Sequence, residues 1–208
     1  MFTGIVQGSF TIRSVERKPG LYTLVFEFPE SMLDGLEIGA SVAIDGVCLT
    51  VTEIDDNKVN FDVMQETLSL TTLGDVTSGT LVNVERSAKQ GVEIGGHIIS
   101  GHVDGCAEVV AIEQPENNCF VTYKIPTEKT KYIFQKGFVG LNGCSLTVAD
   151  VDKGNNTLKV CYIPETLRVT NHGKKTIGEK VNFEIDRQTQ TIVDTVENFL
   201  STNPGLFN

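Results

Sequence analysis

The sequence predicts an all-β protein with two tandem, similar six-stranded antiparallel Greek-key barrels, followed by a C-terminal α-helix. Three features predict this fold: an internal repeat, a strand-like alternation of apolar and polar residues in each half, and one helical pattern after the second half. A chain of 208 residues has room for one large β domain or for two domains of about 100 residues each. The repeat favours two domains.

The repeat is clearest where DGVCLTV at 45–51 corresponds to NGCSLTV at 142–148, an offset of 97 residues. The same offset of 97 relates FTGIVQG (2–8) to ISGHVDG (99–105). After a two-residue slip the offset is 99, and it relates ETLSLT (66–71) to ETLRVT (165–170) and VNVE (82–85) to VNFE (181–184). Such a period is far too long for a solenoid and indicates a duplicated domain. We expect barrels at 1–97 and 98–186, connected through the Gly-rich QGVEIGG (90–96), and a C-terminal helix and tail at 187–208.

Within each half, the pattern is that of strands. The segments 21–28, 41–54 and 58–64 alternate apolar and polar residues and are rich in Val, Ile, Phe and Thr. Turn residues at 55–57 and 153–156 separate the strands into hairpins. About six short strands per half suggest a small closed barrel, because closure removes exposed strand edges.

Helices are expected in three places. Short pieces are predicted just after a Pro at 29–36 and 126–136. The longest pattern spans 187–203, where one face carries Ile192, Val193, Val196, Phe199 and Leu200. This amphipathic helix could cover its own barrel or pack on the same helix of other subunits.

Composition excludes several classes of function. A net charge of −10 argues against nucleic acid and anionic membrane as partners. No window approaches the ~20 apolar residues of a membrane span, and the N-terminus lacks the regions of a signal peptide, so we expect a cytoplasmic protein. Five cysteines without a Cys-x-x-Cys pair favour neither a disulfide framework nor a zinc cage. His97 and His102 lack a third ligand in the sequence pattern, so no metal site is expected.

The residues that match between the two copies are mostly glycines and threonines in turns and strand starts. Two copies of one ligand pocket would leave such matches, because loops carry function whereas cores need only volume and pattern. Glycines would let the backbone approach a flat ligand, and threonines would offer hydroxyls to a heterocycle; the pairs are Gly4 and Gly101, Gly46 and Gly143, Thr50 and Thr147, Thr67 and Thr166. The alternative is a duplication that only enlarged the core and created a surface between domains.

The differences between the copies suggest chemistry. The differing pairs are Ile5 and His102, Cys48 and Ser145, Ser87 and Asp186. A histidine carries protons near neutral pH, and an ionised cysteine is a soft nucleophile. The alternatives are a hydrogen-bonded structural histidine, and an aspartate that is a solvated strand end or a helix cap.

Seven motifs together resemble the riboflavin synthase family of the bacterial, twin-barrel type: MFTGIVQG, GVCLTV, MQETL, IGGHIISGHVDG, GCSLTV, IPETL and EIDRQTQTIVDTVE. The resemblance covers essentially the whole chain. It implies a cofactor-free homotrimer with the C-terminal helix at its centre. The implied reaction converts two molecules of 6,7-dimethyl-8-ribityllumazine, by four-carbon transfer, into riboflavin and 5-amino-6-ribitylaminouracil. The active site would hold both molecules between the N-terminal barrel of one subunit and the C-terminal barrel of another. Association with lumazine synthase is a further partner that the resemblance suggests.

The resemblance also implies the site residues. Catalytic importance would fall on Cys48, His102, Ser145 and Asp186, with Ser41 and His97 nearby. Contacts with lumazine would come from Gly4, Ile5, Val6, Cys48, Leu49, Thr50, Asp62, Val63, Met64, Gln65, Glu66 and Thr67 in the first barrel, and from Gly101, His102, Val103, Lys136, Ser145, Leu146, Thr147, Ile163, Pro164, Glu165, Thr166, Leu167 and Arg168 in the second.

Within this hypothesis, the acceptor lumazine loses a proton from its C7 methyl group, and a nucleophile adds to C7 of the donor. His102 is the candidate for proton transfer, and Cys48 for polarity or for placing the nucleophile. The main rival function is a non-catalytic, fluorescent lumazine- or flavin-binding antenna protein, in whose relatives the second copy is eroded. This chain keeps the candidate catalytic residues and both ETL segments, which favours the enzyme. A trimeric scaffold would leave the Gly and Thr matches unexplained.

Overall fold

The computed structural model describes residues 1–89, 91, 93–116 and 118–204. The predicted linker at 90–96 and the predicted C-terminal segment at 187–208 therefore lie partly outside the described residues. Among the described residues, no helix is long and apolar enough to cross a bilayer.

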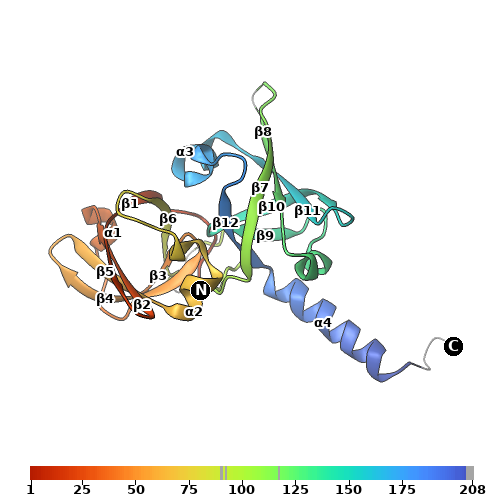
Figure 1. The fold of residues 1–208 in the computed structure, drawn as a ribbon, viewed down its shortest axis with the longest axis horizontal. Helices are drawn as coiled ribbons and strands as arrows, with labels where there is room; N and C mark the ends of the chain where they lie inside the picture. The colour runs from red at the N-terminus through yellow and green to blue at the C-terminus, as the bar shows by residue number, and fades with distance from the viewer. Residues whose placement is uncertain (90, 92, 117, 205–208) are drawn as a thin grey trace.

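Two closed barrels lie side by side, and a helix projects from the second (Figure 1). The first barrel contains β1 (Gly8–Lys18), β2 (Leu21–Glu27), β3 (Ser41–Ile44), β4 (Val47–Asp55), β5 (Lys58–Met64) and β6 (Leu81–Arg86). The second contains β7 (Gly105–Glu113), β8 (Cys119–Lys124), β9 (Phe138–Leu141), β10 (Cys144–Asp152), β11 (Thr157–Tyr162) and β12 (Lys180–Ile185).

Both barrels have one topology. The first closes in the order β1-β2-β5-β4-β3-β6, and the second repeats it as β7-β8-β11-β10-β9-β12. All neighbours are antiparallel. In each ring, three consecutive hairpin strands are followed by a fourth that returns beside the first, which is a Greek key. The predicted fold class is confirmed.

The strand expected over 41–54 is instead a hairpin, β3–β4. The chain reverses at Asp45 and Gly46, with φ of 45° and 80°. Asn142 and Gly143 make the same turn in the second barrel, with φ of 42° and 77°. Asp-Gly and Asn-Gly are the pairs that two-residue hairpin turns with two positive φ angles prefer. The turn signal was present in the sequence, inside what reads as one long apolar run.

The short helices differ from the prediction in length or type. The helix expected at 29–36 is α1 (Glu30–Leu33), and the piece expected at 126–136 is the 3₁₀ helix η2 (Thr127–Tyr132). Two helices not predicted follow the last hairpins, α2 (Gln65–Leu70) and α3 (Pro164–Val169), each continued by a 3₁₀ turn, η1 (Thr72–Gly74) and η3 (Asn171–Lys174). The predicted C-terminal helix is confirmed as α4 (Arg187–Thr202).

Each barrel has its own apolar core, and the two cores differ in one polar feature. In the second barrel, the Tyr162 hydroxyl lies 2.8 Å from the Tyr123 hydroxyl and 3.1 Å from Nδ1 of His172. Nε2 of His172 lies 3.0 Å from the Leu141 carbonyl. The corresponding positions in the first core are filled by the buried Phe26, Val63 and Leu73.

The barrels meet at their two hairpin turns, through buried polar groups related by the repeat. The Asn83 side chain donates to the Asn142 carbonyl (3.0 Å), and the Asn182 side chain donates to the Asp45 carbonyl (2.8 Å). The Asp45 carboxylate accepts from the amide of Asn83 (2.7 Å) and from the side chain of Asn171 (2.9 Å). Burial raises the pKa of Asp45 to about 7, although these hydrogen bonds and Lys175 oppose the shift.

Candidate active site

The N-terminal segment packs on the second barrel, and the start of the second repeat packs on the first barrel. Phe2 and Ile99 form an antiparallel bridge, with N–H···O distances of 2.8 and 3.1 Å. Beyond this bridge, Val6 packs in the core of the second barrel, and Val103 packs against the core of the first. We call residues 2–6 and 99–103 the crossing segments.

This crossing corrects the grouping of the predicted contacts. Gly4, Ile5 and Val6 were assigned to the first barrel, but Gly4 accepts a hydrogen bond from the Ser145 amide of the second barrel at 2.9 Å. In the corresponding place, Gly101 accepts from the Cys48 amide at 2.9 Å. Each site is therefore built from a barrel of one half and a crossing segment of the other.

Glycine is required at both crossing points. Gly4 and Gly101 have φ of 74° and 81°, a region that disfavours side chains. A Cβ atom on Gly101 would lie 2.6 Å from the Cβ atom of Cys48, and a Cβ on Gly4 would overlap that of Ser145. The crossing segments thus approach the predicted catalytic positions more closely than any other residue type allows.

Two buried carboxylates hold the crossing segments. Glu85 accepts from the amides of Thr3 (2.6 Å) and Gly4 (3.1 Å), and Glu184 accepts from the amides of Ser100 (2.8 Å) and Gly101 (3.0 Å). Burial raises the pKa of both carboxyl groups, against the effect of these hydrogen bonds. Neither glutamate is among the site residues predicted from the sequence. The available signal was a glutamate at the same place in the two matching strand motifs, VNVE and VNFE.

The second barrel has a cavity of ≈ 170 Å³ at its crossing segment. Its lining combines the crossing segment, the start of β10 and helix α3, and includes Gly4, Ile5, Val6, Cys144, Ser145, Glu165, Thr166, Val169 and Thr170. Six of these residues were predicted as contacts from the sequence. Sites for drug-sized ligands usually measure roughly 300–1,000 Å³, so this cavity would enclose only part of such a molecule.

Ser145 and His97 meet at the edge of this cavity. The Ser145 hydroxyl accepts from the His97 amide (3.0 Å) and lies 2.6 Å from Nδ1 of the His97 ring. The ring stacks on Phe138, with centroids 5.1 Å apart. Burial lowers the pKa of His97, and the negative charge of Asp186 partly opposes this. The structure therefore brings together two of the predicted catalytic residues, His97 and Ser145, within the field of a third, Asp186.

Asp186 itself caps helix α4. Its carboxylate accepts from the amides of Gln188 and Thr189, both at 3.2 Å, and from the Thr189 hydroxyl at 2.6 Å. The helix-cap alternative for this residue is thus correct as a description of its contacts. Its charge still acts on the His97 ring.

In the first barrel, the corresponding positions are Cys48 and the start of α2. Cys48 is half-buried, and Ser41 is paired with Thr50 across β3 and β4. Asp62 accepts from the Thr23 hydroxyl at 2.7 Å. Met64, Gln65 and Glu66 are exposed and Thr67 is half-buried around the start of α2. Over them lies the crossing segment that carries His102, whose side chain is exposed.

The remaining predicted contacts divide into three groups. The side chains of Leu49, Val63 and Leu146 are buried in the barrel cores, so only their backbones could contact a ligand. Thr147, Lys136 and Ile163 are exposed beside the second site. Pro164, Leu167 and Arg168 line a different cavity of ≈ 310 Å³ behind α3, so the structure does not bring them to the cavity that contains Ser145.

No group of three or more His, Cys, Asp or Glu side chains suited to a metal ion occurs in the described part of the chain. The groups available for chemistry are the His97–Ser145 pair, the thiol of Cys48 and the exposed imidazole of His102. They can donate, accept and transfer protons beside a bound heterocycle.

The arrangement is that of a duplicated β-barrel protein with equivalent crossing points in its two halves, one of them beside a cavity. The model of the lumazine binding domain matches residues 3–87 and again residues 100–186, so the chain belongs to the lumazine-binding family.

Three bacterial riboflavin synthases are among the similar sequences. The protein of Escherichia coli K12 is 52% identical over 209 residues, covering 100% of this chain and 97% of the relative. That of Chlamydia pneumoniae is 42% identical, covering 98% of each, and that of Bacillus subtilis 168 is 38% identical, covering 89% and 85%.

Solved structures of LumP are similar in fold. LumP complexed with riboflavin superposes with a TM-score of 0.82 at 29% identity, covering 90% of this chain and 100% of LumP. LumP complexed with 6,7-dimethyl-8-(1'-D-ribityl) lumazine gives a TM-score of 0.80 at 28% identity, with the same coverage.

Proposed function

We propose that this chain is a riboflavin synthase, a transferase that converts two molecules of 6,7-dimethyl-8-ribityllumazine into riboflavin and 5-amino-6-ribitylaminouracil. The observation that carries the proposal is the duplicated site, because two identical substrates require two similar pockets. Relatives of that name, one of them 52% identical over the whole chain, support it. Transfer of a four-carbon unit between the substrates then requires small differences between the pockets.

The differences between the pockets are at the residues suited to proton transfer. The first site has Cys48 and the exposed His102, and the second has Ser145 with His97. In this proposal, His102 moves the proton of the acceptor's C7 methyl group, and the Ser145–His97 pair places the nucleophile that adds to C7 of the donor. Fixing two reactants side by side supplies much of the rate, since effective molarities can reach about 10⁵ M or more.

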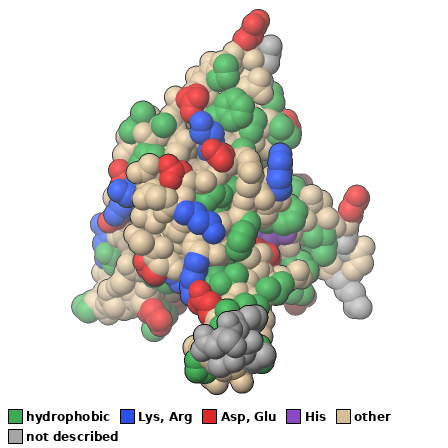
Figure 2. All heavy atoms as spheres, turned by 90° about the vertical axis from the view of Figure 1, so that its right-hand side faces the viewer, with side chains coloured by type: hydrophobic (Ala, Val, Ile, Leu, Met, Phe, Trp, Pro, Cys, Tyr) green, Lys and Arg blue, Asp and Glu red, His purple; other side chains and the backbone are tan. Residues whose placement is uncertain are grey.

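The proposal includes a homotrimer. Within one chain the buried Asn83–Asn142 contacts hold the barrels together, whereas the partial cavity at Ser145 leaves a ligand open to a neighbouring molecule. The apolar face of α4 also supports a trimer, because 64% of Ile192, 50% of Val196 and 53% of Phe199 is exposed. Hydrophobic side chains are exposed around this helix and on the barrel above it (Figure 2). Of the predicted face, Val193 packs on the chain's own barrel core.

The proposal has three further parts: the domain limits come from the repeat, the location from the sequence composition, and the partner from the family resemblance. The domain limits are 1–97, 98–186 and 187–208, the location is the cytoplasm, and lumazine synthase is a candidate partner. These limits group each crossing segment with the barrel that is adjacent in sequence. In the structure, each segment packs on the other barrel.

A non-catalytic lumazine- or flavin-binding antenna protein is the second candidate. The structural similarity to ligand-bound LumP favours binding of such molecules. The higher identity to riboflavin synthases, and the presence of Cys48, His97, His102, Ser145 and Asp186, favour the enzyme.

The test is to mix the purified protein with the lumazine and record its absorption spectrum over time. An enzyme produces about half a molecule of riboflavin per lumazine consumed, as the stoichiometry of the reaction requires. A shifted, stable spectrum without riboflavin would mean an antenna protein. Replacing Cys48 or His102 should slow turnover far more than it weakens binding, and equal effects would mark both as pocket lining.

A further inference from the structure

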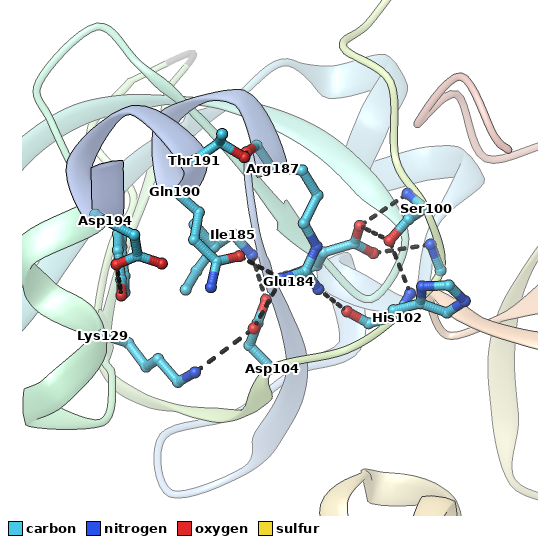
Figure 3. Close-up of polar contacts among 12 residues, drawn as sticks. Ser100, His102, Asp104, Lys129, Glu184, Ile185, Arg187, Gln190, Thr191 and Asp194 are labelled. Carbon is cyan, nitrogen blue, oxygen red and sulfur yellow. Dashed lines mark hydrogen bonds and ion pairs between the residues drawn. The ribbon is translucent and has the colours of Figure 1, made fainter. Parts of the chain in front are cut away.

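Arg187, the first residue of α4, reaches back to the crossing segment that carries His102 (Figure 3). One terminal nitrogen of its guanidinium group donates to the His102 carbonyl. The other lies 3.1 Å from Oδ1 of Asp104 and donates to the Gln190 side chain at 2.7 Å. Arg187 thereby links the C-terminal helix to the peptide of a candidate catalytic residue.

Asp104 fixes the guanidinium group in this position. Its side chain is only 8% exposed, and it accepts from the Ile185 amide at 2.9 Å. Lys129 approaches the same carboxylate at 3.6 Å, so two cations and one amide surround it. The Asp104 end of the pair is thus shielded from water, whereas the Arg187 side chain is 37% exposed. Hydrogen bonds to a buried carboxylate have a more defined geometry than those of a fully exposed pair.

The peptide of His102 is held from both sides. Its amide donates to the Ser100 hydroxyl at 3.1 Å, and that hydroxyl is itself bonded to Glu184 at 2.7 Å. Its carbonyl accepts from Arg187. The imidazole, in contrast, is exposed and makes no hydrogen bond to the described residues. The place of the ring therefore depends on the backbone that carries it.

The first half of the chain has only part of this arrangement. Gln7 is the counterpart of Asp104, and its side chain accepts from the Arg86 amide at 2.8 Å, as Asp104 does from Ile185. Ala88 is the counterpart of Arg187, and Ile5 is the counterpart of His102. The guanidinium contact is thus present only in the copy that has the histidine.

Stability of the helix does not explain Arg187. A cation in the first turn opposes the helix dipole and is mildly unfavourable there. The N-cap Asp186 already supplies the negative charge and the hydrogen bonds that this helix end needs, so capping does not require Arg187.

We propose that Arg187 is a positioning residue for His102: its contacts with the His102 carbonyl and with Asp104 fix the crossing segment so that the imidazole faces the substrate of the first barrel. This inference rests on the proposed function. It makes the start of α4, the helix proposed to mediate assembly, part of the support of the catalytic site.

The test compares Arg187→Ala with Lys131→Ala. Lys131 also ties α4 to the barrel, through Asp194 and Glu197, but does not contact the crossing segment. Arg187→Ala should lower kcat about 10-fold or more with KM within about twofold, because small displacements of catalytic groups are costly. Lys131→Ala should change neither. Arg187→Lys should recover only part of the loss, since an ammonium group cannot reproduce the forked contact with two oxygens.

A second measurement does not depend on turnover. Hydrogen–deuterium exchange of the peptide containing 99–104 should become faster in Arg187→Ala and stay unchanged in Lys131→Ala. Unchanged kcat and unchanged exchange in Arg187→Ala would overturn the inference, as would equal effects of the two variants. A wild-type protein that makes no riboflavin would overturn the proposed function alone, and the exchange of 99–104 would then decide whether Arg187 holds the segment.

Discussion

The amide of Cys48 donates a hydrogen bond to the carbonyl of Gly101 at 2.9 Å, and this bond joins the two halves of the chain at a candidate catalytic residue. The amide of Ser145 makes the equivalent bond to Gly4, also at 2.9 Å. Each site therefore needs both repeats. A barrel cut out at its repeat boundary would lack the segment that completes its site.

Replacing Gly101 by Ala should damage the first site through the clash with Cys48. Gly79 supplies the control, because it has a φ of 91° and no atom within 4 Å of an added Cβ. Both variants bear the cost of a side chain at positive φ, about 1–2 kcal/mol, but only Gly101→Ala adds overpacking, about 1–3 kcal/mol. Urea unfolding should show this difference. In a lumazine titration, the number of molecules bound per chain should fall from two to one in Gly101→Ala only. Equal behaviour of the two variants would contradict the proposed role of the crossing segments.

The crossing could not have been predicted from the sequence. Each crossing segment could pack on its own barrel or on the other one. The apolar side chains of Phe2 and Ile99 suit either arrangement, and the repeat pattern is the same in both. What the repeat did predict is the shared topology, because strand alternation and turn residues act locally. The 3₁₀ form of 127–132 was missed because a Pro followed by charged residues predicts a helix start without its hydrogen-bond spacing.

The contacts within the candidate site could likewise be predicted only in part from the sequence. The exchange of Cys48 for Ser145 was visible as a difference between the copies, but the partner of Ser145 was not. His97 lies 48 residues earlier in a Gly-rich stretch, and only the fold brings it to 2.6 Å from the hydroxyl. Long-range polar contacts of this kind depend on the register of several strands at once, which no local pattern encodes.

Asp45 should make stability depend on pH in a direction opposite to that of a salt-bridged aspartate. Its pKa is raised from 3.8 to about 7 in the folded protein. The contribution of Asp45 to the free energy of unfolding is therefore fully present below about pH 4 and is lost as the pH rises through 7. Asp45→Asn, which copies Asn142 of the other turn, removes this titration. Between pH 5 and pH 8, the unfolding free energy of the wild type should fall by about 2–3 kcal/mol relative to the variant. Urea melts at the two pH values measure it, and parallel pH profiles would refute it.

Replacing Tyr162 by Phe should destabilise the second barrel specifically. The hydroxyl connects Tyr123 and His172 inside the core, and its loss leaves both buried groups short of a partner. We expect a loss of about 1–3 kcal/mol in urea unfolding. The control is Val63→Ile at the matching position of the first core, where no hydrogen bond is at stake and a change of one methylene tests packing alone. If tyrosine's role were packing, Tyr162→Phe would be nearly neutral.

Ser145→Ala should separate catalysis from binding at the second site. The variant removes the oxygen that the His97 amide and Nδ1 contact, at 3.0 and 2.6 Å, while the apolar part of the cavity stays in place. Riboflavin formation at saturating lumazine should fall at least ~10-fold, because the pair no longer directs a proton or a nucleophile. The number of lumazines bound per chain should stay at two.

Ser145→Cys is the matched control, since it places in the second site the residue that Cys48 provides in the first. A sulfur atom is a weak acceptor, so this variant should fill the space without restoring the rate. Recovery of wild-type turnover by cysteine would show that Ser145 contributes volume and not hydrogen bonding.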